Sequence, residues 1–143
     1  MPMTIGFKIG NVFNEIGTSD FLHSFFSTIS FNLEPKGWGS RFPELMNQLY
    51  KGKLDVAQAK KALADARIIK TELAGLKPEK IIWDIEHLEK KPPWGKRIDK
   101  SVTSLANYHI TTTSRVLMDL LIECLEYEVE SGKLLTVEKL YQQ

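Results

Sequence analysis

Apolar and polar residues alternate at the start of the chain and predict a strand. From Met3 to Ile9 every second residue is apolar, which is the spacing of a strand with one buried face. Gly10-Asn11 supplies the positive-φ positions of a two-residue turn. We therefore expect residues 3–17 to form a hairpin.

The second strand of this hairpin carries a polar residue on its apolar face. The register set by the turn places Ile5 opposite Ile16 and Asn14 opposite Phe7. A polar residue in that position favours a bulge, or an edge position in the sheet, for the second strand.

Apolar residues at helical spacing predict four helices. The pattern recurs every three or four residues, as one buried stripe requires. Capping residues precede the first and the last of these segments, at Thr18-Ser19-Asp20 and at Thr113 or Ser114. Alanines in the third segment imply close approach to a neighbour, for which the last helix is the candidate. The expected helices span about 18–33, 43–50, 54–76 and 113–131.

Aromatic and β-branched residues favour three further strands, at residues 80–85, 106–112 and 134–138. Residues 80–85 are also compatible with a helical turn. Glycine and proline make residues 37–43 and 91–95 irregular loops. These elements predict one domain over residues 1–143, of the α+β class. It combines a small antiparallel or mixed sheet, made of the N-terminal hairpin and later strands, with about four helices.

Composition and charge restrict the class of protein. The chain has 143 residues, 43% of them hydrophobic and 26% charged, with a net charge of +1. This is typical of one folded domain and gives no overall attraction to nucleic acid or to an anionic membrane. No apolar run approaches the roughly 18 residues of a membrane span, and the N-terminus lacks the pattern of a secretion signal. We expect a cytoplasmic protein with no nucleic-acid or membrane partner.

The charge is unevenly distributed along the chain. Residues 1–100 carry a net charge of +4 and residues 101–143 a net charge of −3. In the last expected helix, four carboxylates follow at steps of four, three and four residues and so share one side: Asp119, Glu123, Glu126 and Glu130. Such a stripe is either the solvated face of an amphipathic helix or a binding surface for a basic partner.

A basic loop surrounds one tryptophan. Pro92-Pro93-Trp94 is flanked by several cations, namely Lys90, Lys91, Lys96, Arg97 and Lys100. A solitary aromatic residue, diluted by nearby carboxylates, is poor evidence for stacking of single-stranded nucleic acid. We expect this segment to be a structural or protein-contact loop.

Few residues are candidates for chemistry. Asp84, Glu86 and His87 offer metal ligands, but on a strand His87 points away from the two carboxylates and no second cluster completes a site. His23 and His109 accompany no recognisable nucleophile motif. We expect no catalytic residue, no cofactor and no metal.

The chain also contains one cysteine, Cys124, which has no partner for an internal disulfide. It falls on the apolar stripe of the last helix, where a thiol is ordinarily inert packing. We expect a structural role for it.

Three stretches resemble the bacterial immunity protein 70 family: TIGFKIGNVFNEIG, FLHSFFSTISFNLEPKGWGSRFP and IIWDIEHLEKKPPWG. The most specific pieces are the irregular motifs at residues 37–43 and 92–95. The resemblance implies a cytoplasmic protein without catalysis, which binds and blocks the C-terminal toxin domain of a cognate polymorphic toxin. Toxins paired with such proteins are often nucleases. No toxin-contact residue is carried over from the family.

A nuclease active site is basic, and carboxylates can occupy it in place of phosphates. We therefore hypothesise that Asp119, Glu123, Glu126 and Glu130 meet a cationic toxin surface. The alternative interface consists of Trp38, Arg41 and Trp94, because tryptophan beside arginine or lysine is typical of binding hot spots. For both tryptophans, however, core packing is the favoured interpretation.

Two other functions remain open. The first is a regulatory module that binds a peptide or protein, or that forms a homo-oligomer through its sheet edge. The second is a small hydrolase, in which His87 or His109 acts as a base beside Asp84 or Glu86.

Overall fold

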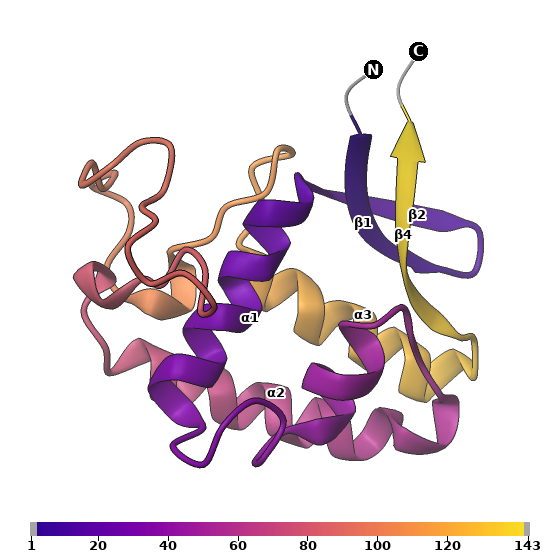
Figure 1. The fold of residues 1–143 in the computed structure, drawn as a ribbon. Helices are drawn as coiled ribbons and strands as arrows, with labels where there is room; N and C mark the ends of the chain where they lie inside the picture. Colours follow the sequence, from indigo (N-terminus) through magenta and orange to yellow (C-terminus); the bar gives the residue numbers. More distant parts are fainter. Residues whose placement is uncertain (1–2, 142–143) are drawn as a thin grey trace.

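A four-stranded antiparallel sheet forms one side of the molecule in the computed structural model, which describes residues 3–141. The strands are β1 (Met3–Ile9), β2 (Val12–Gly17), β3 (Lys53–Leu54) and β4 (Leu135–Tyr141), in the order β2-β1-β4-β3. Long strands β1 and β4 lie side by side at the centre (Figure 1). The predicted hairpin and final strand are confirmed, although β4 runs to residue 141 rather than 138.

The hairpin contains the irregularity that the sequence predicts. Asn14 pairs with Phe7, and its side-chain amide donates a hydrogen bond to the Phe7 carbonyl at 3.2 Å. The register then shifts, so that Ile5 pairs with Gly17 and the predicted pair with Ile16 is wrong. One extra residue on β2 produces this shift, as in a β-bulge, and β2 is an edge strand.

The helices lie on one side of the sheet. They are α1 (Ser19–Leu33), α2 (Ala59–Ala74), α3 (Leu117–Ser131) and a π-helical segment, Glu44–Leu49. Helices α1 and α3 contact the sheet, and the alanine-rich stripe of α2 packs against α3 as predicted. The fold is therefore α+β, as the sequence indicates (Figure 1).

Two helices begin later than predicted. Helix α2 starts at Ala59 instead of residue 54, because Lys53–Leu54 pairs with β4 as a short strand. Helix α3 starts at Leu117. Neither Thr113 nor Ser114 is its cap, because the chain turns there and Ser114 has a positive φ of 65°, which a right-handed helix excludes.

The strand expected at residues 80–85 is absent from the described chain. A 3-10 turn, Pro78–Lys80, precedes an irregular segment that lies along α1. The carbonyl of Ile82 accepts hydrogen bonds from the hydroxyls of Ser24 (2.8 Å) and Thr28 (3.1 Å), and its N–H donates to Thr28 (3.1 Å). Side chains of α1 thus satisfy the backbone groups that a neighbouring strand would have paired.

The strand expected at residues 106–112 is also wrong. Residues Leu105–Asn107 form a 3-10 turn capped by the side chain of Ser104. Beyond it, Ile110 makes a single bridge to Val116, and the carbonyl of His109 accepts from the backbone N–H of the first residue of α3 at 2.8 Å. The segment is a connection between the core and α3.

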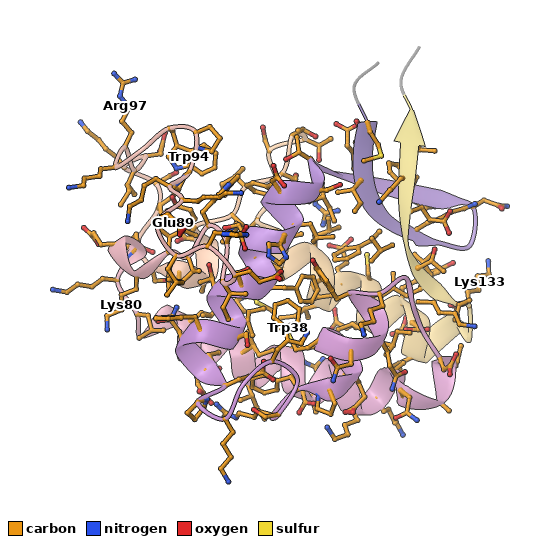
Figure 2. The ribbon with its side chains drawn as sticks, viewed as in Figure 1. Trp38, Lys80, Glu89, Trp94, Arg97 and Lys133 are labelled. Carbon is orange, nitrogen blue, oxygen red and sulfur yellow. The ribbon has the colours of Figure 1, made fainter. Side chains whose placement is uncertain are left out.

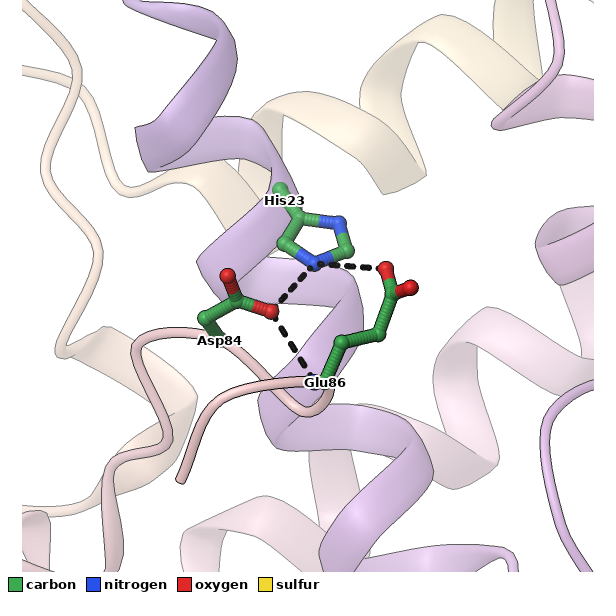
Figure 3. Close-up of side chains that lie close together, drawn as sticks. All are labelled: His23, Asp84 and Glu86. Atoms are coloured by element: carbon green, nitrogen blue, oxygen red, sulfur yellow. Dashed lines mark hydrogen bonds and ion pairs between the residues drawn. The ribbon is translucent and has the colours of Figure 1, made fainter. Parts of the chain in front are cut away.

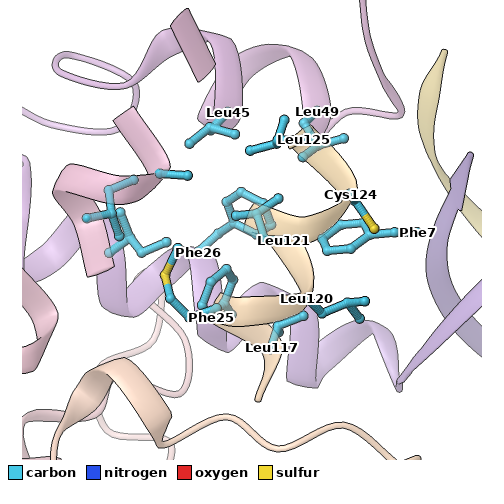
Figure 4. Packing of buried hydrophobic residues seen from close by; sticks show 14 of the residues in the cluster. Phe7, Phe25, Phe26, Leu45, Leu49, Leu117, Leu120, Leu121, Cys124 and Leu125 are labelled. Carbon is cyan, nitrogen blue, oxygen red and sulfur yellow. The ribbon is translucent and has the colours of Figure 1, made fainter. Parts of the chain in front are cut away.

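One hydrophobic core lies between the sheet and the helices. Figure 4 shows how α3 packs between the sheet and α1. Phe7 of β1 lies beside Cys124 of α3, and Phe25 and Phe26 of α1 lie near Leu121 of α3. Cys124 is buried and unpaired, as expected for a packing role. Within residues 3–141, no helix has the length and apolarity needed to cross a bilayer.

Candidate functional site

The acidic stripe lies on α3, and three of its members pair with cations of the same molecule. Asp119 lies 2.8 Å from Lys70, and Glu126 lies 3.0 Å from Arg67, both on α2. Glu123 pairs with Arg115, just before α3. These pairs are solvent-exposed, with Glu126 48% exposed, so each stabilises the fold by at most about 1 kcal/mol. A partner's cations can therefore replace them at low energetic cost.

The fourth member, Glu130, lines a hollow between α3 and the β1–β2 hairpin. The hollow has a volume of about 400 Å³, and its walls combine three stripe carboxylates with the exposed apolar side chains of Val12 and Tyr127. No ion pair to Glu130 occurs among the residues that the structure describes. The combination of negative charge and exposed apolar surface is what a cationic protein partner would contact.

Trp38 and Arg41, two residues of the alternative interface, both bind other groups of the same molecule. The indole N–H of Trp38 donates to the carbonyl of Met46 at 3.0 Å, and its ring packs against the core. Arg41 forms a bidentate ion pair with Glu72, in which Nη1 lies 2.7 Å from one carboxylate oxygen. Their hydrogen bond lowers the pKa of the Glu72 carboxyl. Trp38 is therefore placed as a packing residue, whereas the exposed pair of Arg41 and Glu72 is as open to replacement by a partner as the pairs of the acidic stripe.

Trp94, the third residue of that interface, lies on the surface loop. Its indole N–H donates to the hydroxyl of Tyr108 at 2.8 Å, and its ring meets Trp83 edge-on, yet 38% of the residue is exposed. Figure 2 shows Arg97 of the same loop projecting away from the body of the molecule. A second hollow of about 370 Å³ lies under this loop, with Lys90, Lys91 and Lys96 among its lining residues. The loop therefore presents a basic and aromatic surface.

A third cluster, of His23, Asp84 and Glu86, joins α1 to the irregular segment that follows α2. The sequence does not predict this cluster. His23 Nε2 lies 3.1 Å from Asp84 Oδ1 and 3.9 Å from Glu86 Oε1 (Figure 3). The sequence predicts a strand for Asp84 and Glu86 and offers His87 as the nearby imidazole, but no strand forms there and His87 lies on the surface, 3.6 Å from Glu89. His23 is 61 residues from Asp84, and no local pattern connects them.

Burial shifts the pKa of Asp84 upward, but hydrogen bonds outweigh it. The backbone N–H of Glu86 donates to Asp84 Oδ1 at 2.9 Å and His23 lies against the same oxygen, so the pKa of this carboxyl is lowered overall. Asp84 is a carboxylate at neutral pH. It can accept hydrogen bonds or coordinate a cation.

Two buried groups are unsuited to catalysis. His109 is enclosed in the core, where its Nε2 lies 3.0 Å from the hydroxyl of Ser24, and desolvation lowers its pKa to about 3. Burial, assisted by the charge of Glu123, raises the pKa of the Cys124 thiol to about 12. At neutral pH His109 is an uncharged packing residue and Cys124 an unreactive thiol. Among residues 3–141, no carboxylate forms a hydrogen bond or ion pair with His109 of the kind that the hydrolase alternative needs.

Fold and surface together define a small α+β protein with charged and aromatic surfaces around one core. The model of the Immunity protein 70 family matches residues 7–137, which is most of the chain, and the protein belongs to this family. The resemblance drawn from the sequence motifs is thereby confirmed. Membership makes it an immunity protein, a class whose partner is a cognate toxin. No curated protein and no solved structure matches the chain.

Proposed function

We propose that this protein neutralises the C-terminal toxin domain of a cognate polymorphic toxin, a nuclease, by covering it, and that it catalyses no reaction itself. The observation that carries the proposal is the family match over residues 7–137. An inhibitor of this kind needs a surface complementary to its target and no catalytic residues.

The proposed contact surface is the acidic hollow, defined by Glu123, Glu126 and Glu130 of α3 with Val12 and Tyr127. Asp119 extends it along the helix. Nucleases bind phosphates through lysine and arginine, so their active sites attract carboxylates as well. The two exposed apolar side chains supply the area that excludes water around such ion pairs.

Charge reversal tests this surface. We expect the double substitution Glu126→Lys and Glu130→Lys to weaken binding to the toxin domain roughly tenfold or more, mainly through slower association. The dependence of affinity on salt concentration should also decrease, because fewer opposite charges attract the partner. Binding kinetics at several salt concentrations, together with inhibition of the toxin's nuclease activity, provide the measurements.

A matched control is available on the other charged surface. Glu79→Lys with Glu89→Lys makes the same change in net charge at two exposed residues of the segment after α2. This control should bind the toxin domain with nearly the affinity of the unmodified protein. Equal loss of affinity in both double variants would mean that net charge, rather than the acidic hollow, controls binding.

A further inference from the structure

The cluster of His23, Asp84 and Glu86 has the spacing of a metal site. The three candidate ligand atoms, one from each side chain, all lie within 4.8 Å of one another. His23 Nε2 is 3.1 Å from the aspartate oxygen and 3.9 Å from the glutamate oxygen. Tetrahedral zinc, with bonds of about 2.0–2.2 Å, holds its ligand atoms about 3.3–3.6 Å apart. The two distances from His23 Nε2 bracket this value, and the candidate oxygens of Asp84 and Glu86 lie within 4.8 Å of each other, so side-chain rotations can bring all three atoms to one ion.

The imidazole of His23 is already oriented for such a role. Its Nδ1 lies 2.6 Å from the hydroxyl of Tyr50. Binding an ion requires the tautomer in which Nδ1–H donates to this oxygen, so that the Nε2–H facing Asp84 gives up its proton and the Nε2 lone pair is directed toward the two carboxylates, as in metal sites where an outer residue fixes the tautomer. The ring of Trp38 stacks on the imidazole at 6.1 Å between centroids, with 22° between the planes. The ligand therefore has little freedom to turn away.

The two carboxylates complete the donor set from the loop. Asp84 is positioned by the backbone N–H of Glu86 and by Lys90, whose Nζ lies 3.9 Å from the second aspartate oxygen. The side chain of Glu86 is 76% exposed, which gives an ion a path from solvent. Figure 3 shows both carboxylates directed at the same edge of the imidazole.

We propose that His23, Asp84 and Glu86 form a binding site for a divalent transition-metal ion, for which Zn²⁺ is the best match. One imidazole nitrogen and two carboxylate oxygens are ligands that Zn²⁺ accepts, whereas Mg²⁺ and Ca²⁺ prefer oxygen alone. The two negative charges balance the ion, and water fills the remaining position. The ion would join helix α1 to the loop that follows α2.

Zinc titration of tag-free, chelator-treated protein tests the site. Calorimetry at pH 7 with ZnCl₂ should show one saturable equivalent. Glu86→Gln should weaken the affinity at least about tenfold, and His23→Gln should abolish the binding. Since Glu86 is mostly exposed, its variant should keep the far-UV circular dichroism and unfolding temperature of the metal-free protein. That variant decides the question even where His23→Gln fails to fold.

The neighbouring His87 and Glu89 provide the matched control. They form an exposed histidine–carboxylate pair 3.6 Å apart on the same loop, without a third ligand. His87→Gln and Glu89→Gln should leave zinc affinity unchanged. Absence of a saturable equivalent in the unmodified protein, or equal loss of affinity in these two variants, would overturn the proposal. Toxin plays no part in the measurement, so its outcome is independent of the proposed function.

Discussion

The carboxyl group of Glu128 is buried and only half of its hydrogen-bonding capacity is satisfied within the described chain. Its side chain is fully buried near the end of α3. One oxygen accepts the backbone N–H of Leu135 at 3.1 Å, and the other has no hydrogen-bond partner among the described residues. Burial raises the pKa of this carboxyl to about 7, with a smaller contribution from Asp55. Below about pH 7 the folded protein therefore retains a proton on Glu128.

This proton makes stability depend on pH. In the unfolded chain the pKa of a glutamate is about 4.3, so between about pH 4.5 and pH 7 the folded state binds more protons than the unfolded state. Linkage then requires that the contribution of Glu128 to the free energy of unfolding falls as pH rises through this window, by up to roughly 3 kcal/mol. Glu128→Gln removes the titrating group. Urea unfolding at pH 5, 6, 7 and 8 should show the variant gaining stability relative to the unmodified protein as pH rises.

Glu130→Gln is the control for this pH series. It removes a carboxylate from the same helix at an exposed position, so its stability difference should stay nearly constant across the range. A constant difference for Glu128→Gln as well would show that the buried carboxyl titrates normally.

At the scale of elements, the segment after α1 is organised by one side chain that local patterns do not reveal. Glu34 is buried, and its two oxygens accept the backbone N–H groups of Gly39 (3.0 Å), Arg41 (3.1 Å) and Phe42 (3.0 Å). Gly39 has a φ of 77°, and a Cβ there would lie 2.2 Å from the side-chain nitrogen of Asn47. The motif at residues 37–43 is irregular because it wraps around this carboxylate.

Removing that carboxylate should loosen the loop. Glu34→Ala leaves three backbone N–H groups without their acceptor, at a cost of about 3–5 kcal/mol in the free energy of unfolding. Glu34→Gln, which keeps one acceptor oxygen, should cost less. Thermal and urea unfolding measure both variants, with the exposed Glu89→Ala as a control expected within about 0.5 kcal/mol of the unmodified protein. A loss below about 1 kcal/mol for Glu34→Ala would contradict the role assigned to Glu34.

The elements predicted correctly are those whose signals are local. The alternation in β1, the Gly10-Asn11 turn, the Thr18 cap and the Gly132 stop each lie within a few residues of the structure they specify. Their residues determine hairpin and helices without reference to distant parts of the chain.

The strand predicted at residues 80–85 is wrong because the partners of this segment are distant. Residues 80–85 have the composition of a strand, but the hydroxyls of Ser24 and Thr28, more than 50 positions away, take up the hydrogen bonds of Ile82. The same docking places Asp84 beside His23. Propensity does not register such long-range contacts, so the sequence does not reveal the cluster of His23, Asp84 and Glu86.

At the scale of the whole molecule, two different surfaces lie on opposite sides of α1. The sheet and the C-terminal half of α3, which lies beside the β1–β2 hairpin, occupy one side. The loop of residues 81–104 occupies the other (Figure 1). The first side carries the acidic hollow and the second the lysines and Trp94. A toxin with a basic active site should use the first, and a partner with an acidic surface would use the second.

Substitution of the two tryptophans distinguishes these surfaces. Trp38→Ala removes a half-buried ring and its hydrogen bond to Met46, so it should cost about 2–4 kcal/mol in the free energy of unfolding. Trp94→Ala removes a more exposed ring and should cost about 1–2 kcal/mol, chiefly the contacts with Trp83 and Tyr108. Below its unfolding temperature, each variant should bind the toxin domain with unchanged affinity, because neither ring lies at the acidic hollow. Unfolding curves and binding constants from the same samples test both statements.

Loss of toxin affinity in a stably folded Trp94→Ala protein would instead assign the toxin to the loop. An exposed aromatic residue whose removal weakens binding without lowering stability is a contact residue.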